Sequence, residues 1–311
     1  MRAVRGRDGS PVLTDVDEPP GQGELLTMKA SGICGSDMEY LHYGTSKILG
    51  HELVGFRADG TAVAVEGLYG CGQCEPCLEG RFNLCRDAIS NALGSGLDGG
   101  MVEQFRAPSA RLVELPAGLA PEDGALVEPA AGSWHGVRMG GGAAGKRVAV
   151  VGGGSFGLLA AAAAQAQGAE QVDMEVRHPH QHEVRERLGA GETDGKYDLV
   201  IEAAGSPSAL QRCIKLVRFG GTIVVLGFHP GNIELPFWPL LTKEVTLIPT
   251  IGYCEHEGGR DMQQAAEMLA GRPEIAEAVI THRFPLEDAP EAFRVANDRA
   301  KGAIKVVVEV G

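Results

Sequence analysis

The sequence predicts an α/β protein of two domains, one built on a doubly wound parallel sheet and the other mainly of β-strands. At 311 residues the chain is long enough to form two separate cores. Its first 60 or so residues show short strands and turns, typical of an antiparallel β unit, and strand and helix patterns alternate from Ala130 onward. A glycine-rich turn also joins an apolar strand to an alanine-rich helix, as in parallel-sheet domains.

That glycine turn lies within the segment Lys146–Leu159, around which the chain is organised. Val148–Val151 is an apolar run suited to a buried parallel strand, and a helix is expected over Leu158–Gln167. Glycines at this spacing permit a tight turn, close approach to a pyrophosphate and packing of helix on strand, with the helix N-terminus facing the anion. Such a motif alone is often only a flexible loop, but between a strand and a helix it predicts a dinucleotide site in a Rossmann domain. The expected cofactor-binding residues are Gly152, Gly153, Gly154, Ser155, Phe156 and Gly157.

Composition excludes several classes of partner. The net charge is −13, the pI is near 5.2, and no basic tract stands out, so neither nucleic acid nor an anionic membrane is an expected partner. The N-terminus lacks the apolar core of a signal peptide, and the apolar run from Leu158 stops at Gln165, too early to span a bilayer. We therefore expect a cytoplasmic protein, in which cysteines indicate metal binding more than disulfides.

Four of the seven cysteines follow the spacing C-x2-C-x2-C-x7-C. This spacing lets one loop wrap a tetrahedral ion and close all four coordination positions. Four free thiols or a redox pair are the alternative, which we disfavour because four exposed thiols without metal would be reactive liabilities. An iron–sulfur cluster is also possible from the ligand set alone, but we favour zinc. The pattern predicts a structural zinc held by Cys71, Cys74, Cys77 and Cys85.

Three further residues in the first β unit have the chemistry of a catalytic zinc site. Cys34, His51 and Glu52 are the soft and harder ligand types that zinc accepts, and they follow an expected strand over Glu24–Ala30. Singly, such a cysteine is usually a packing residue, and such a histidine is usually a satisfied polar side chain. Only their combination favours a metal site.

Taken together and in order, these motifs resemble the zinc-dependent medium-chain alcohol and polyol dehydrogenases. The resemblance covers the whole chain and implies a GroES-like catalytic domain over 1–129, a Rossmann domain over 130–252 and a return to the catalytic domain over 253–311. The segments that carry it are Cys34–Asp37, Gly50–Glu52, the four clustered cysteines, Gly99–Glu103, Val127–Pro129 and the glycine turn.

The resemblance implies a role for each candidate metal ligand. Cys34 and His51 match the fixed ligands of the catalytic zinc. Glu128 matches a position where polyol dehydrogenases present a carboxylate at or near the metal. Glu52 matches a carboxylate that either exchanges onto the metal or lies just behind it.

The resemblance also implies a proton path, with one departure from the family. Ser36 matches the hydroxyl that passes on the substrate proton, and Asp37 matches the carboxylate that orients the ligating histidine; the alternative for both is a polar turn. Glu39 stands where many relatives carry a histidine that relays the proton to solvent. Glu39, His42 or the cofactor ribose therefore remain alternative exits. The segment between Glu52 and Cys71 is also shorter than is usual in the family.

The cofactor preference is read from the end of the second Rossmann strand, expected over Gln171–Val176. NAD-preferring enzymes place a ribose-binding acid at this strand end, and by spacing that position falls on Val176. Arg177 and His178 instead offer groups suited to a 2′-phosphate. Glu175 could replace the acid if the strand slipped by one residue, and a solvated basic turn is the other alternative. We predict NADP in preference to NAD.

Later segments complete the expected cofactor domain. Two further strands end in Gly205 and Gly227, which should line the nicotinamide crevice. Arg299 matches a family position near the pyrophosphate, although an exposed helix-end arginine is the alternative. Val245–Ile251 reads as an edge strand, which in the family pairs two subunits, so a homodimer or homotetramer is expected.

A catalytic zinc beside a nicotinamide cofactor predicts hydride transfer between an alcohol and NAD(P). A secondary alcohol, sugar or polyol remains open as substrate, and the reverse reaction would make the protein a ketone or aldehyde reductase. The same residues argue against two other classes of protein. A non-catalytic dinucleotide sensor would have lost Cys34, His51 or Glu128, and a zinc-free enone or quinone reductase would lack both ligand sets.

Overall fold

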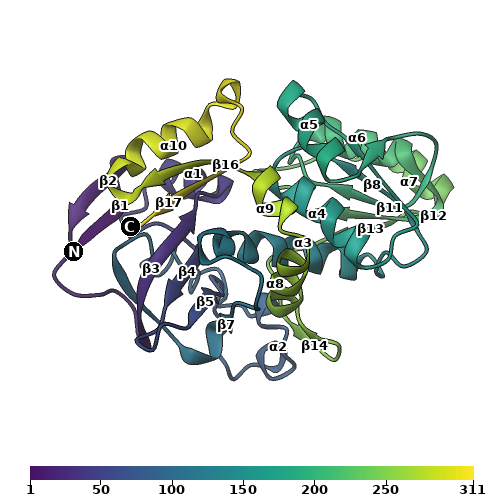
Figure 1. The fold of residues 1–311 in the computed structure, drawn as a ribbon. Helices are drawn as coiled ribbons and strands as arrows, with labels where there is room; N and C mark the ends of the chain where they lie inside the picture. The colour runs from purple at the N-terminus through teal and green to yellow at the C-terminus, as the bar shows by residue number, and fades with distance from the viewer. The chain divides into compact units, whose positions relative to one another are not determined.

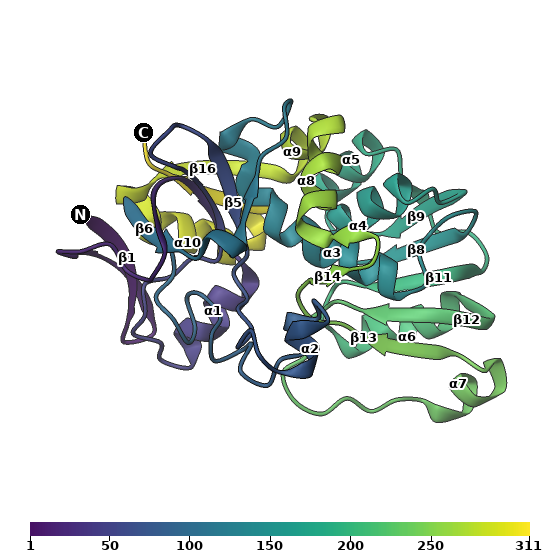
Figure 2. The same cartoon turned by 90° about the horizontal axis from the view of Figure 1, so that it is seen from below.

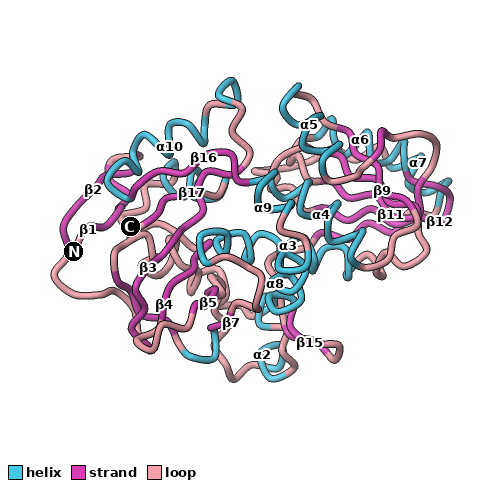
Figure 3. Tube along the Cα trace, viewed as in Figure 1, coloured by secondary structure: helices cyan, strands magenta, loops and turns pink.

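The computed structural model describes residues 1–311, with the exception of the side chain of Arg299. The chain forms two compact units (Figure 1). The first comprises Met1–Glu128 and Cys254–Gly311, and the second comprises Pro129–Tyr253. The division falls in the first turn of α3 (Val127–Met139). Figure 3 shows the first unit as rich in strands and the second as alternating strand and helix, as the sequence predicts.

A seven-stranded sheet forms the frame of the first unit. Its order is β16-β17-β3-β4-β5-β7, with β6 paired to β3. β3 alternates, with Leu26, Met28 and Ala30 buried and Leu25 and Thr27 exposed, because successive side chains of a strand point to opposite faces. The strands are β3 (Glu24–Gly32), β4 (Glu52–Phe56), β5 (Ala62–Val65), β6 (Gln104–Ala107), β7 (Leu112–Glu114), β16 (Ile280–Pro285) and β17 (Lys305–Glu309).

Hairpins and helices complete this unit. α10 (Ala289–Asn297) packs against β2 (Ser10–Asp15), β16 and β17 (Figure 1). The buried Phe293 of α10 joins Leu26, Phe105 and Val308 in the main core. The hairpins are β1 (Arg2–Arg7) with β2 (Ser10–Asp15), and β14 (Glu255–His256) with β15 (Gly259–Arg260). The helices are α1 (Gly35–His42), α2 (Glu75–Leu78), α8 (Asp261–Gly271), α9 (Glu274–Val279) and α10 (Ala289–Asn297), with 3-10 turns at Phe82–Leu84, Ser109–Arg111, Pro121–Leu126, Leu286–Asp288 and Arg299–Lys301.

The second unit is a six-stranded sheet in which every pairing is parallel. Its order is β10-β9-β8-β11-β12-β13, most of which can be followed in Figure 2. The chain moves outward from β8 in both directions, so the topological switch point lies between β8 and β11. The strands are β8 (Arg147–Val151), β9 (Gln171–Glu175), β10 (Gly191–Glu192), β11 (Tyr197–Glu202), β12 (Val217–Val225) and β13 (Thr246–Pro249).

Four helices follow the strands of this sheet: α4 (Ser155–Ala166), α5 (Pro179–Arg187), α6 (Pro207–Leu216) and α7 (Phe237–Lys243). α6 buries Leu210, Cys213 and Ile214 against β8, β11 and β12. The doubly wound fold class is thereby confirmed. Within the described part of the chain, no helix is long and apolar enough to cross a membrane.

α4 begins three residues earlier than the sequence pattern predicts, at Ser155 instead of Leu158. Gly157 therefore lies within the first turn of the helix, where an added Cβ would collide with the carbonyl of Gly152. The third glycine of the motif thus allows the helix to approach the strand, so the helical pattern extends into the glycine turn.

Candidate functional site

Cys34, His51 and Glu52 converge in the first unit. Each offers one ligand atom, and these atoms all lie within 4.8 Å of one another. Cys34 is the N-cap of α1, and Glu52 begins β4 directly after His51. Because β3 and β4 are antiparallel with Gly32 opposite Glu52, the end of one strand meets the start of the other. The sheet therefore assembles a soft sulfur, an imidazole and a carboxylate at one place.

Asp37 ties this cluster to α1. Its Oδ2 accepts a hydrogen bond from the Cys34 N–H at 2.9 Å, and its Oδ1 lies 3.4 Å from Nδ1 of His51. Burial lowers the pKa of His51, but the charge of Asp37 and its hydrogen bond, with Cys34, raise that pKa well above its usual value. Since Nδ1 faces Asp37, Nε2 is the ring nitrogen left for a metal, in the arrangement typical of metal-binding histidines.

Ser36 and Tyr40 flank the same histidine. The Ser36 hydroxyl oxygen lies 3.3 Å from Nε2 of His51. Tyr40, one helical turn further along α1, places its ring edge-on to His51 with centroids 6.1 Å apart. Burial raises the pKa of Tyr40, while His51 and the Ser36 hydroxyl partly oppose that rise. Sequence reasoning missed Tyr40, although its position four residues after Ser36 placed both on one helix face.

Glu52 is held by a lysine that the sequence analysis also missed. Nζ of Lys305, at the start of β17, lies 2.6 and 2.7 Å from the two carboxylate oxygens and donates to the Ile33 carbonyl at 3.1 Å. Glu52 is fully buried and Lys305 is 2% exposed. Burial lowers the pKa of Lys305, but Glu52, Cys34 and Glu128 raise it overall, so the ammonium stays charged. A side chain on Gly32 would collide with this carboxylate.

Glu128 lies in the first turn of α3 and is half-buried. It is not among the three residues whose ligand atoms meet, but its charge acts on Lys305. The structure therefore brings together Cys34, His51 and Glu52, with Ser36 and Asp37 beside them, and leaves Glu128 outside the immediate cluster.

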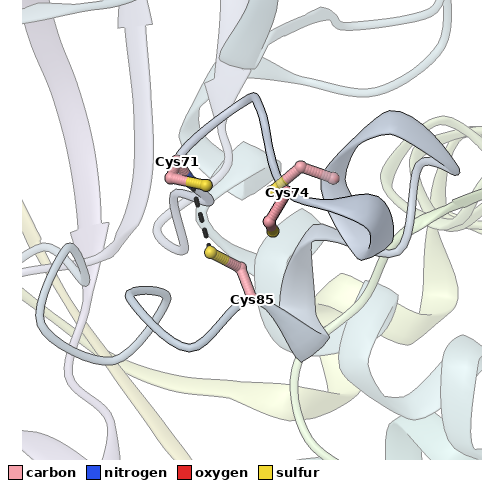
Figure 4. A group of neighbouring side chains, drawn as sticks. Cys71, Cys74 and Cys85 are labelled. Carbon is pink, nitrogen blue, oxygen red and sulfur yellow. Dashed lines mark hydrogen bonds between the residues drawn. The ribbon is translucent and has the colours of Figure 1, made fainter.

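The four clustered cysteines form a second candidate metal centre. Their sulfurs all lie within 4.8 Å of one another, and Figure 4 shows Cys71, Cys74 and Cys85 converging from a loop that includes α2. Cys85 Sγ accepts hydrogen bonds from the N–H groups of Cys71 and Asp87, at 3.3 and 3.4 Å. Backbone donors favour thiolate sulfur, which is the form that binds metal.

The pKa values of two of these thiols reflect the same surroundings. The N–H groups of Gln73 and Cys74 lower the pKa of Cys71 to about 6. The N–H of Cys77 acts to lower the pKa of Cys74, but burial and the neighbouring thiols raise it to about 12. Four cysteine sulfurs are the donor set typical of a closed tetrahedral zinc site. The sulfur, nitrogen and oxygen donors of the first cluster are instead typical of an open, catalytic zinc site.

The glycine turn lies at the carboxyl end of β8. Gly152 has φ +131°, and a Cβ there would come within 2.8 Å of the Ala203 backbone. Gly154 is the N-cap of α4, and nothing lies within 4 Å of where its Cβ would be. Open space at a helix N-terminus is what a pyrophosphate requires. Ser155 and Phe156 begin the helix, and the Ser133 hydroxyl donates to the Phe156 carbonyl at 3.1 Å.

Arg177 and His178 lie in the short turn between β9 and α5. Both backbone N–H groups donate to Oε1 of Gln181, at 3.1 and 3.2 Å, which fixes the turn into α5. The Arg177 guanidinium donates to the Ser208 hydroxyl at 3.3 Å. Glu175 is already engaged, since its Oε1 accepts from Arg212 Nε at 2.6 Å and from the Thr193 hydroxyl at 2.7 Å.

Gly205 and Gly227 follow β11 and β12 and lie against each other, because a Cβ on Gly227 would collide with the Gly205 backbone. The predicted cofactor contact of Arg299 lies outside the described residues, since that side chain is not described.

Two protein-family models match the chain. Residues 21–117 match the alcohol dehydrogenase GroES-like domain, and residues 156–271 match the zinc-binding dehydrogenase model.

Individual relatives match over almost the whole chain. The L-galactonate-5-dehydrogenase of Escherichia coli K12 is 32% identical over 92% of this chain and 92% of its own length. The L-arabinitol 4-dehydrogenase of Aureobasidium melanogenum is 29% identical over 97% of this chain and 92% of its own. Among solved structures, a protein of Sinorhizobium meliloti 1021 described as a zinc-binding dehydrogenase and bound to NADP superposes with a TM-score of 0.86. It is 30% identical and covers 99% of this chain and 98% of its own.

Proposed function

We infer the role of each residue from one premise, that the chain belongs to the zinc-dependent medium-chain alcohol and polyol dehydrogenases. It is an NAD(P)-dependent oxidoreductase that acts on small alcohols. The observation that carries the assignment of the active site is the convergence of Cys34, His51 and Glu52 beside the Ser36 hydroxyl. We propose that this cluster is the catalytic centre.

In this proposal Cys34 and His51 hold the catalytic zinc, with Glu128 at or near it. Zinc bound there would supply a Lewis acid for the alcohol oxygen, and a bound nicotinamide would supply the hydride acceptor. The Asp37 carboxylate orients the His51 ring, and its negative charge would offset the positive charge of the bound zinc. The Ser36 hydroxyl, next to His51 Nε2, takes the hydroxyl proton of the substrate and passes it on. Lys305 keeps Glu52 paired, so that Glu52 serves as a positioning carboxylate or an exchangeable ligand.

We propose that a second, structural zinc is held by Cys71, Cys74, Cys77 and Cys85. Because such a site needs reduced thiols, we also propose a reducing compartment such as the cytoplasm. The four sulfurs with their backbone donors match a closed site with no position left for substrate.

We propose NADP in preference to NAD. The acid expected in an NAD-preferring enzyme is absent at Val176, and Glu175 is occupied by Arg212 and Thr193. Arg177 lies beside the Ser208 hydroxyl, a cation and a hydroxyl donor of the kind that binds a 2′-phosphate. His178, next in the chain, is the third candidate phosphate contact.

We propose that the catalytic domain comprises residues 1–129 and 253–311 and the cofactor domain residues 130–252. For the quaternary structure we propose a homodimer or homotetramer assembled through β13. This strand is the edge of its sheet, and exposed apolar residues lie close to it in sequence, with Phe237 70%, Trp238 72% and Ile251 49% exposed. Light scattering should then give the molar mass of a monomer for an Ile251→Arg variant. A molar mass equal to that of the wild-type oligomer would contradict this interface.

The substrate is proposed to be a secondary alcohol of the sugar or polyol class. The test is a panel of sugar alcohols, aldonates and simple secondary alcohols, with NAD and NADP, followed at the absorbance of the reduced nicotinamide. The matching ketones should be tested in the reverse direction. Turnover of no alcohol or ketone by zinc-loaded protein that binds the cofactor would favour the sensor alternative.

A further inference from the structure

A buried carboxylate lies where β11 and β12 end. Glu202 is the last residue of β11 and is fully buried. Its Oε1 accepts the N–H groups of Ala204 and Gly205, at 2.9 and 2.8 Å. Its Oε2 lies 3.0 Å from Nε2 of His229, whose side chain is 9% exposed. One carboxylate therefore joins the segment after β11 (203–205) to the segment after β12 (226–229).

The backbone reinforces this junction. The N–H groups of Leu226 and Gly227 donate to the Glu202 carbonyl, at 2.8 and 3.1 Å. A Cβ on Gly227 would collide with the Glu202 carboxylate, and a Cβ on Gly205, where φ is +63°, would lie 2.5 Å from the Phe228 carbonyl oxygen. Both glycines are thus required by the closeness of the two segments.

The same junction reaches the glycine turn. The Ala203 N–H donates to the carbonyl of Val151, at 2.9 Å, directly before Gly152. In the sheet register Glu202 stands opposite Val151 on one side and Val225 on the other. Glu202 therefore lies on the β11 side of the switch point, at the edge where a dinucleotide crosses such a sheet.

The direction of the cofactor follows from this placement. The candidate 2′-phosphate contacts are at the end of β9, and the pyrophosphate site is at the end of β8. The nicotinamide half must then extend to the other side, over the ends of β11 and β12. Resting on the proposed cofactor site, we propose that Glu202 and His229 are positioning residues that hold segments 203–205 and 226–229 in place for the nicotinamide.

The experiment compares whole cofactors with fragments that lack nicotinamide. Binding of NAD and NADP, and of ADP-ribose and 2′-phospho-ADP-ribose, is measured by titration calorimetry on the full chain. His229→Ala removes a partner of a buried carboxylate, so the Kd of the whole cofactor should rise about tenfold or more. The Kd of the matching fragment should change by less than about twofold. Glu202→Gln retains an acceptor for the two backbone N–H groups. The Kd of the whole cofactor for this variant should therefore lie between the values for the wild type and His229→Ala.

Arg218→Gln is the matched control. Arg218 pairs with Asp198 at 2.6 Å and joins the same two strands near their amino ends. This variant should bind cofactors and fragments as the wild type does. Equal weakening of cofactor and fragment by His229→Ala, or the same nicotinamide-specific loss in Arg218→Gln, would overturn the proposal and indicate a general structural role. A wild type that binds the fragments but neither cofactor would refute the proposal, and one that binds none of the four would refute the proposed cofactor site instead.

Discussion

Replacing Lys305 by methionine should cost far more stability than removing any exposed lysine. Methionine fills similar space but leaves the Glu52 carboxylate, fully buried, without the ammonium that contacts both of its oxygens. Removing one partner of a buried ion pair typically lowers the free energy of unfolding by about 3–5 kcal/mol. In a folding unit of this size, each kcal/mol lowers Tm by about 2–4 °C, so we expect a fall of about 6–20 °C.

The assay is calorimetric melting with urea unfolding of zinc-loaded protein. Adding Glu52→Gln to Lys305→Met removes the unpaired charge, so the double variant should recover most of the loss. The control is Arg294→Met, which breaks the exposed pair with Glu291 on α10 and should cost about 1 kcal/mol or less. The reasoning fails if Lys305→Met costs no more than this control, or if the double variant is as unstable as the single one.

Four further outcomes follow from the proposed sites. Ser36→Ala should retain zinc and cofactor binding but lower turnover by about 10²-fold or more, and unchanged turnover where chemistry limits the rate would remove the serine from the mechanism. Cys77→Ser should lose one of two zinc ions by metal analysis, whereas an unchanged zinc content would contradict the structural site. Arg177→Ala should weaken NADP by about 1.5–3 kcal/mol and leave NAD nearly unchanged, whereas equal losses would show that the arginine does not read the phosphate. Burial raises the pKa of Glu175, but Arg212 and Thr193 lower it overall. The ionised Glu175 therefore stabilises the folded state above the ordinary glutamate pKa, and this contribution is lost as the pH falls through the pKa of Glu175 in the folded protein. Arg212→Gln should therefore lose less stability than wild type between pH 6 and about 3 in urea unfolding, and an identical pH dependence would refute this linkage.

The sequence was sufficient for the elements whose signal is local. The glycine turn needs only the apolar strand before it and the helix after it, and the structure has both. Cys34 caps α1, and Ser36 and Asp37 lie in its first turn, so their spacing alone placed them together. The four cysteines likewise lie within one short loop. The edge strand expected over Val245–Ile251 corresponds to β13, which the structure places at the edge of its sheet.

What the sequence could not supply are partners distant in the chain. Lys305 stands alone in an apolar strand and reads as an exposed residue, but β17 pairs with β3 and brings it to Glu52, 253 residues away. The contact between Glu202 and His229 depends on how β11 and β12 end, which no spacing rule describes. The predicted start of α4 at Leu158 was also wrong. The helix begins at Ser155, where the close approach of Gly157 to the Gly152 carbonyl extends the helix into the glycine turn.

These distant partners share one physical property, which explains why they matter to the site. Lys305 and Glu202 are ionisable groups, and both side chains are buried. A buried charge is tolerated only when its ionic and hydrogen-bonding partners are held in place. Such groups constrain the geometry around them more tightly than apolar packing does, since an apolar contact can slide without leaving a charge unpaired. Each lies beside residues proposed to hold the metal or the cofactor. The local motifs therefore define which chemistry is present, and the buried long-range pairs keep those motifs in position.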